Sequence, residues 1–128
     1  MQNFNWRITL ILAFNLGSLA WALLASPIPQ DLSYHNFADK RAIFGVPNFF
    51  DVISNVLFFF VGWAGIQAAR QNVQESSRPA WIVFFVGILL IGIGSAFYHW
   101  TPDNFTLVWD RLPMTVGFMG LFVALLSE

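Results

Sequence analysis

The sequence contains no cysteine and has few charged side chains. Without cysteine, disulfide bridges and thiolate metal ligands are excluded. Charged residues make up 10% of the 128 residues, whereas a soluble globular domain has roughly a quarter. The formal net charge is −1, so nothing indicates nucleic acid or an acidic surface as a partner. These absences argue against both a soluble domain and a nucleic-acid-binding protein.

Histidine is also scarce, because His35 and His99 are the only two in the sequence. Catalytic zinc is normally held by three protein ligands. One copy of this sequence therefore cannot supply three histidine ligands.

Apolar residues, in contrast, are abundant: 57% of the sequence is hydrophobic and 18% is aromatic. A helix that crosses a bilayer needs roughly 17–25 mainly apolar residues. Stretches of that length predict four membrane helices, at about residues 8–25, 48–69, 80–100 and 105–126. We therefore expect an all-α, polytopic transmembrane helix bundle, with residues 1–128 forming a single membrane domain.

The first apolar stretch has two interpretations. It is long enough to span a membrane, but it also follows Arg7 near the amino terminus, as a signal peptide would. A cut after Ala25 would place Leu23 where signal peptides have a small residue. This mismatch favours a retained helix and leaves the cleaved signal open.

Positive charges predict how the bundle is oriented. Arg70 and Arg78 flank one loop, which we expect on the cytoplasmic side together with Arg7. The connection after the first helix and the turn after the third would then face outward. Lys40 and Arg41 in that connection count against this orientation.

A serine, a histidine and an aspartate stand out within the last two apolar stretches. Ser95 and His99 are four residues apart and share one face of a helix. A turn after His99 would return Asp110 to the same depth. Ionisable groups at membrane depth cost roughly 2.5–3.5 kcal/mol each and normally have partners. Two interpretations remain open: a structural His99–Asp110 hydrogen bond between helices, or a functional site.

The second apolar stretch begins with polar residues at helical spacing, namely Asp51, Ser54 and Asn55. They are predicted to line the same cavity as Ser95 and His99. The alternative is a helix end that is simply wetted at the membrane interface. The polar connection before this stretch is expected to contain a short helix near residues 34–43.

Two segments resemble a known family. Gly94-Ser95-x-x-x-His99-x-Thr101, followed by Asp110-x-x-Pro113-Met114, resembles the first active-site motif of the alkaline ceramidases. Residues 48–55 (Asn-Phe-Phe-Asp-Val-Ile-Ser-Asn) resemble the first core helix of that family. The family belongs to a superfamily of seven-helix membrane hydrolases. The resemblance covers about residues 34–128 and implies the amino-terminal half of a seven- or eight-helix fold, that is, an incomplete domain.

The resemblance implies a zinc-dependent hydrolase that cleaves the amide bond of ceramide or a related long-chain lipid amide. His99 would be a zinc ligand, Asp110 would orient water and accept its proton, and Ser95 would donate to the developing oxyanion. The family's two other ligands come from a His-x-x-x-His pair that this sequence lacks. Further carboxy-terminal helices or a second copy would have to supply them. The substrate would enter from the bilayer.

Eukaryotic relatives carry an acidic calcium-binding segment before the first core helix. Here Asp39 and Asn48 form a possible calcium or structural polar site, opposed by Lys40 and Arg41. The pattern therefore resembles a bacterial member, which would lie in the inner (plasma) membrane. The alternative function is a non-catalytic, receptor-like or scaffold protein of the same superfamily that keeps His99 and Asp110 for packing.

Overall fold

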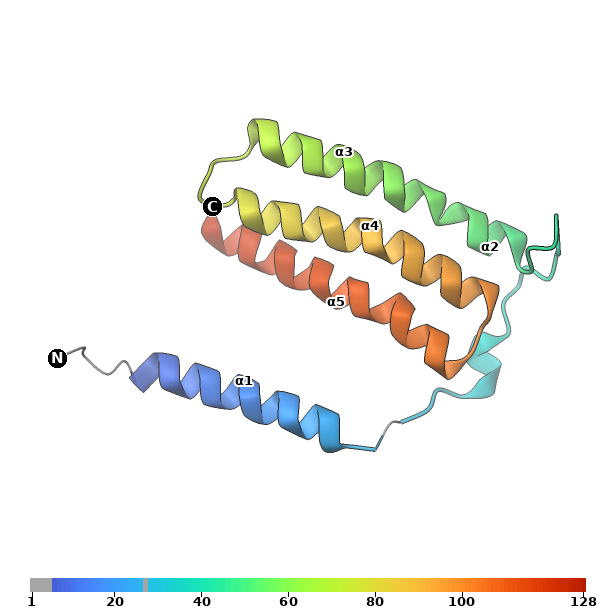
Figure 1. Cartoon of the computed structure of the whole chain (residues 1–128), viewed down its shortest axis with the longest axis horizontal. Coiled ribbons are helices and arrows are strands. Elements are labelled where there is room, and N and C mark those ends of the chain that lie inside the picture. The colour runs from blue at the N-terminus through green and yellow to red at the C-terminus, as the bar shows by residue number, and fades with distance from the viewer. Residues whose placement is uncertain (1–5, 27) are drawn as a thin grey trace.

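The computed structural model describes residues 6–26 and 28–128. This part consists of helices and loops, without a strand. The helices are α1 (Trp6–Leu24), the 3-10 helix η1 (Leu32–His35), α2 (Phe49–Ser54), α3 (Val56–Asn72), α4 (Arg78–Trp100) and α5 (Asn104–Ser127) (Figure 1). Within the described residues, four helical stretches are long and apolar enough to cross a membrane: Trp6–Leu24, Phe49–Asn72, Arg78–Trp100 and Asn104–Ser127. The expected all-α bundle with four membrane helices is therefore confirmed.

The second of these stretches is interrupted at Asn55, between α2 and α3. The side-chain amide of Asn55 donates to the backbone carbonyl of Asp51 at 2.7 Å. An asparagine side chain that bonds one turn back competes with the helix for its own backbone acceptors. A single helix was expected here, but the structure has a short helical segment followed by a longer one.

Helix α4 lies at the centre of the bundle, with α3 on one side and α5 on the other (Figure 1). Glycines let the backbones approach closely on both sides. A Cβ added to Gly87 of α4 would lie 2.6 Å from the Cα of Gly117 in α5. A Cβ added to Gly62 of α3 would lie 2.9 Å from the carbonyl oxygen of Phe85 in α4. The hairpins α3–α4 and α4–α5 are therefore held by backbone contact.

Helix α1 stands apart from the other helices (Figure 1). None of its residues is buried, and it packs against no other helix in the described part of the chain. Its exposed side chains are largely apolar and include Trp21 and Leu24. The exposed apolar surface of α1 is suited to contact with lipid. It leaves open whether the segment is a retained membrane helix or a cleaved signal peptide.

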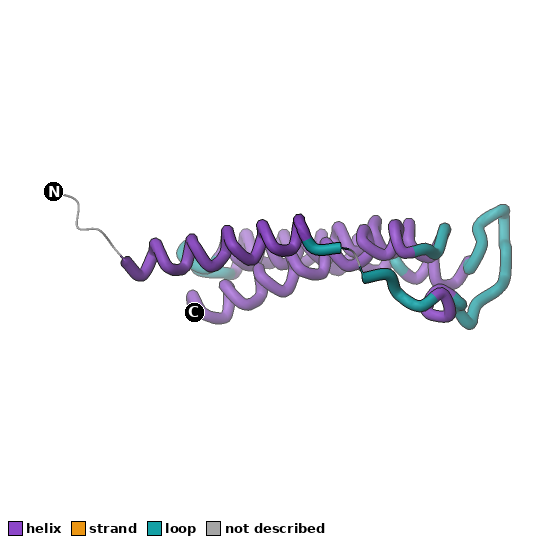
Figure 2. Tube along the Cα trace, turned by 90° about the horizontal axis from the view of Figure 1, so that it is seen from below, coloured by secondary structure: helices purple, strands orange, loops and turns teal. Residues whose placement is uncertain are grey.

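Residues 28–48 form a long loop at the end of the bundle where α4 ends and α5 begins (Figure 1 and Figure 2). Only Leu32–His35 is helical in this loop, where a longer helix was expected. The backbone then turns back on itself at Gly45, which has a φ of 78°, between the bridge partners Ile43 and Val46. Gln30 ties the beginning of the loop to α5, because its backbone N–H donates to the Asn104 side chain at 2.7 Å.

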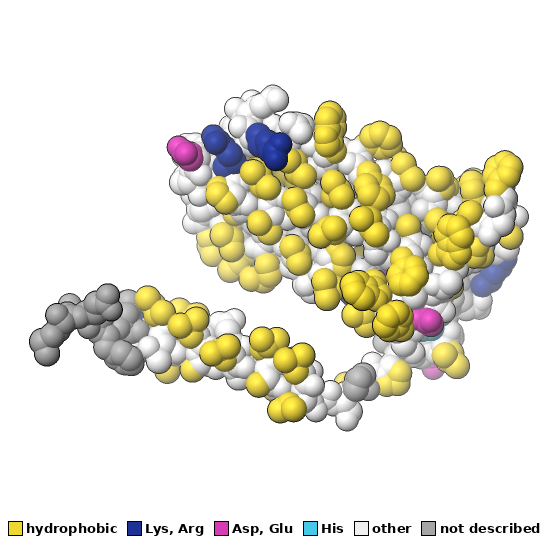
Figure 3. Space-filling view, in the orientation of Figure 1, with side chains coloured by type: hydrophobic (Ala, Val, Ile, Leu, Met, Phe, Trp, Pro, Cys, Tyr) yellow, Lys and Arg dark blue, Asp and Glu magenta, His cyan; other side chains and the backbone are white. Residues whose placement is uncertain are grey.

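Polar groups are gathered at the two ends of the bundle, and the face in Figure 3 is largely apolar between them. The α3–α4 loop and the end of α5 lie at one end, and the long loop and the α4–α5 turn lie at the other (Figure 1). The start of α2, His99 near the end of α4 and Asp110 near the start of α5 all belong to the end with the long loop.

Candidate functional site

The backbones of α4 and α5 touch beside the Ser-His-Asp constellation. A Cβ added to Gly94 would collide with the backbone carbonyl oxygen of Trp109 and would lie 3.4 Å from the Cα of Asp110. Ser95 follows Gly94 directly, and His99 lies one turn further along α4. The structure therefore brings Ser95, His99 and Asp110 to the same end of the helix pair.

A tight turn returns the chain from α4 to α5. Asp103 caps α5 by accepting the backbone N–H of Thr106 at 2.6 Å, and the Thr106 hydroxyl accepts the backbone N–H of Asp103 at 3.1 Å. This capping box satisfies backbone groups at the helix start. The Thr106 backbone N–H is the main reason why the pKa of Asp103 lies below its ordinary value. Because α5 starts so soon after α4, Asp110 returns to the level of the last turns of α4.

His99 and Asp110 each keep a buried atom without a hydrogen-bond partner among the described residues. These atoms are His99 Nδ1 and Asp110 Oδ1. Asp110 is only 8% exposed and the neighbouring Ser95 is 7% exposed. No hydrogen bond joins His99 to Asp110 in the described part, so the interhelical bond considered from the sequence is not present there.

Unpartnered buried polar atoms are costly and therefore informative. Each costs about 1–3 kcal/mol, and native proteins contain only a few. The described residues have three such side-chain atoms: His35 Nε2, His99 Nδ1 and Asp110 Oδ1. His35 belongs to the long loop, so all three come from the same end of the bundle. This concentration is typical of a functional site, where a ligand completes the bonding.

A groove of about 360 Å³ lies beside Asp110. Its lining combines polar groups from the loop end with apolar side chains further along α5: Tyr34, Asp110, Arg111, Met114, Thr115 and Phe118. Met114 and Phe118 also line an apolar groove of about 240 Å³ over α4. The two grooves together give a polar end and an apolar path along the helices, which suits a lipid chain with a polar head.

The polar residues at the start of the second membrane stretch do not line the groove beside Asp110. Ser54 is exposed and donates its hydroxyl to the Asp51 carbonyl at 2.9 Å. Asn55 is buried, and its side-chain amide donates to that same carbonyl. Asp51 itself is half-buried. Ser54 and Asn55 therefore bond back to their own helix, and their role in lining a cavity stays a prediction.

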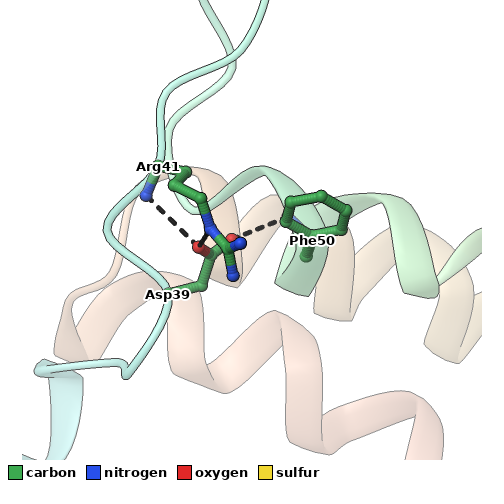
Figure 4. A network of polar contacts seen from close by, with 3 residues as sticks. All are labelled: Asp39, Arg41 and Phe50. Atoms are coloured by element: carbon green, nitrogen blue, oxygen red, sulfur yellow. Dashed lines mark hydrogen bonds and ion pairs between the residues drawn. The ribbon is translucent and has the colours of Figure 1, made fainter.

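Asp39 joins the long loop to the start of α2 (Figure 4). Its carboxylate accepts from Arg41 Nε at 2.7 Å and from the backbone N–H of Phe50 at 2.8 Å. The Arg41 guanidinium also lies over the Phe50 ring, 4.5 Å from its centre. The side-chain bond from Arg41 is the largest cause that holds the pKa of Asp39 below its ordinary value. These are the contacts of a structural polar cluster, and calcium binding there stays a prediction.

Asn48 makes a different connection. Its backbone is left-handed, with a φ of 47°, a conformation that asparagine adopts more readily than most residues. Its side-chain amide donates to the backbone carbonyl of His99 at 2.8 Å. The residue before α2 is thus bonded directly to the last turn of α4.

The described residues do not assemble a complete metal site. No group of three His, Cys, Asp or Glu side chains among them is arranged to hold a metal ion. The unpartnered Nδ1 of His99 fits one imidazole ligand. The donor set of the described residues therefore fits zinc only in part.

Two aromatic residues at the site were not singled out from the sequence. Tyr98 is 3% exposed, and its hydroxyl lies 2.9 Å from His35 Nδ1. Phe37 places its ring 4.5 Å from the His99 ring, centre to centre. A tyrosine hydroxyl inside an apolar helix needs a polar partner, and this requirement is the signal that could have indicated Tyr98.

Comparison with known proteins supports a family assignment. The family model for Ceramidase matches residues 42–128. This region contains α2 to α5 and all three residues of the Ser-His-Asp constellation. Comparisons with curated proteins and with solved structures found no match. The match covers well over half of the sequence, and together with four membrane-length helices it indicates a multi-pass membrane protein; the chain belongs to the Ceramidase family.

Proposed function

We propose that this chain is a ceramidase-like integral membrane hydrolase that cleaves the amide bond of ceramide or a related long-chain lipid amide. One observation carries the proposal: His99 Nδ1 and Asp110 Oδ1 are buried without described partners at one end of the α4–α5 hairpin. Both residues lie in the region that the Ceramidase family model matches. Asp110 also lines a groove that includes the apolar side chains of Met114 and Phe118, which suits a reaction on a lipid, whereas His99 does not line that groove.

His99 is proposed as a zinc ligand through its free ring nitrogen. Bound zinc would supply a Lewis acid that activates water for attack on the amide carbonyl. Two further ligands are needed for a usual catalytic site. Further helices or a second copy of the chain are proposed to supply them, because the described residues hold no three-ligand group.

Asp110 and Ser95 are proposed to handle the proton and the charge. The side-chain carboxyl group of Asp110 would hold the attacking water by a hydrogen bond and accept its proton. The Ser95 hydroxyl would donate a hydrogen bond to the carbonyl oxygen as negative charge develops on it. The C–N bond would then break as the leaving nitrogen takes the proton that Asp110 accepted from water, so that the products are an amine and a fatty acid.

The substrate is proposed to enter from the bilayer. The groove beside Asp110 continues along Met114 and Phe118 into the apolar groove over α4. An acyl chain can lie in this apolar part while its amide reaches the polar end. We place the protein in a bacterial inner membrane, with membrane lipids around its helices.

Hydrolysis assays on the purified protein in lipid vesicles test the proposal. The substrates are ceramide, an N-acyl amino lipid and a phospholipid, and zinc content is measured in the same samples. We expect hydrolysis of an amide lipid in the presence of zinc, and loss of both zinc and activity in a His99→Gln variant. Glu75→Gln, in the exposed loop at the other end of the bundle, is the control.

Three outcomes would count against parts of this proposal. Zinc-loaded protein that hydrolyses none of the three lipids would exclude the enzyme function. A His99→Gln variant that keeps its zinc would show that His99 is not a ligand. A His99→Gln variant of lower stability without metal loss would favour the non-catalytic alternative.

A further inference from the structure

The long loop contacts both sides of the proposed site within four consecutive residues. Phe37 packs its ring on the His99 ring, with centres 4.5 Å apart and planes at 45°. His35 Nδ1 and the Tyr98 hydroxyl form a hydrogen bond of 2.9 Å. The Arg111 guanidinium donates to the Tyr34 hydroxyl at 2.8 Å. The segment therefore contacts His99 itself and the chain neighbours of both His99 and Asp110.

These contacts matter because His99 and Asp110 do not bond each other in the described structure. The close approach at Gly94 sets the separation of the two backbones. It does not set the rotation of the His99 ring, whose Nδ1 has no described partner. Among the described residues, the His99 ring meets the Phe37 ring at 4.5 Å and the ring of its chain neighbour Tyr98 at 5.4 Å. Of these two ring contacts, Phe37 is the one that comes from outside α4.

The segment is itself held from both sides. Tyr98 is buried, and the Phe37 ring meets its ring edge-on at 5.3 Å. On the amino-terminal side, the Gln30–Asn104 bonds tie the loop to α5. On the other side, the Asp39 carboxylate binds the start of α2 through the Phe50 N–H. A segment fixed at both ends can transmit rigidity to the side chains that it covers.

We propose that residues 34–37 form a positioning strap that holds the His99 imidazole and the turn of α5 bearing Asp110 in register. Phe37 is the positioning residue for the His99 ring. The His35–Tyr98 hydrogen bond keeps Phe37 in place. The catalytic consequence rests on the proposed function, whereas the ordering of the His99 ring does not.

Nuclear magnetic resonance of the histidine rings tests the strap directly. The sequence has two histidines, so protein labelled with ¹⁵N in its imidazoles and held in nanodiscs gives two sets of ring signals. A His35→Gln variant assigns them. We expect Phe37→Leu to broaden or split the His99 signal. Phe37→Tyr keeps an aromatic ring at this position and should leave the His99 signal as it is in the parent protein. Phe44→Leu is the matched control, because Phe44 lies in the same loop and is 95% exposed.

A second variant removes a single oxygen atom. Tyr98→Phe leaves the buried ring in place and abolishes the bond to His35. We expect the His35 signal to shift and the His99 signal to broaden. In zinc-loaded, active protein, Phe37→Leu should lower kcat about 10-fold with KM changed less than about 2-fold, because misplaced catalytic groups affect the chemical step.

Each result decides whether residues 34–37 hold the His99 ring in position or only pack against it. Unchanged His99 signals in both Phe37→Leu and Tyr98→Phe, at parental helix content, would overturn the proposal. If Phe37→Leu does not fold, Tyr98→Phe carries the test by itself. A broadened His99 signal in protein that hydrolyses no lipid supports the strap and contradicts the proposed function. Full activity on ceramide with an unchanged His99 signal contradicts the strap alone.

Discussion

At the scale of a residue, Asp110 keeps a buried polar atom that costs stability. Its carboxylate is buried between apolar helices, and one oxygen has no described partner. A polar atom in that position costs about 1–3 kcal/mol unless something bonds it. Such a cost persists at sites where strain or exposure of a group serves a function.

Replacing Asp110 by asparagine should separate these two effects. Asp110→Asn keeps the shape and removes the charge, so we expect the thermal midpoint in detergent to stay the same or rise. Hydrolysis of an amide lipid should fall about 100-fold or more, because asparagine cannot accept a proton. Glu75→Gln, which also removes one negative charge, should change neither quantity. A lower midpoint with retained hydrolysis would assign Asp110 a structural role.

Asp39 predicts an acid-sensitive connection between the long loop and α2. Its folded pKa lies below the ordinary value, chiefly because of the Arg41 side chain. The carboxylate therefore stabilises the fold above the unfolded pKa, and this contribution is lost as the pH falls through the lower folded value. We expect the thermal midpoint to drop below about pH 4, and to drop less in Asp39→Asn. Equal pH dependence in both proteins would contradict this role.

Residue spacing predicted part of this site and missed another part. The motif spacing placed Ser95, His99 and Asp110 at one end of the helix pair, where the structure has them, because helix period and turn length determine their positions. Their roles stay predictions. The contact of Phe37 with His99 was missed. A loop side chain that folds over a distant helix leaves no periodic pattern in the sequence, since its position depends on the whole path of the loop.

The α4–α5 hairpin is the element that makes the site, and Gly94 is its tightest point. A Cβ there would collide with the Trp109 carbonyl oxygen, a backbone atom that cannot move away by changing a rotamer. The capping box of Asp103 and Thr106 closes the same hairpin at its turn. Helix separation and turn length thus act together on the position of Asp110.

A Gly94→Ala variant tests this element. Overpacking at a close contact typically costs about 1–3 kcal/mol, so we expect a lower thermal midpoint and loss of hydrolysis as α5 moves away. Gly17→Ala in α1 is the control, because a Cβ there meets nothing within 4 Å. That change should leave the midpoint unchanged or raise it slightly, as alanine favours helix. Equal midpoints for the two variants would show that α4 and α5 are not in close contact.

The helices themselves were predictable because long apolar runs have few other stable structures in lipid. The observed bounds of α4 and α5, Arg78–Trp100 and Asn104–Ser127, are close to the expected ranges. The break at Asn55 was not predicted. It arises from the side-chain amide of Asn55, which donates to a backbone carbonyl of its own helix. An asparagine in the sequence does not reveal whether its side chain will do this, so an unbroken helix was equally compatible with the sequence.

At the scale of the whole molecule, the absence of cysteine allows a clean test of topology. Ser76 lies in the α3–α4 loop and Phe44 in the long loop, and both are exposed. Because Arg70 and Arg78 flank the former loop, we expect it on the cytoplasmic side. An impermeant maleimide should label Phe44→Cys in intact cells and Ser76→Cys only after permeabilisation. The reverse labelling pattern would show that the bundle has the opposite orientation in the membrane.

The bundle also carries its polar site at one end and not at mid-depth. The long loop and the α4–α5 turn lie at that end (Figure 1). The buried Asp110 lies near the start of α5, at the same end. If the proposed hydrolysis takes place there, the lipid amide would come from the leaflet on that side, since the amide sits near the headgroups of its own leaflet. In sealed vesicles the reaction would first exhaust one leaflet, and its later progress would report how fast the lipid crosses the bilayer. The position of Ser95 and His99 on α4 and of Asp110 on α5 would thereby make the proposed hydrolase respond to the lipid composition of one leaflet.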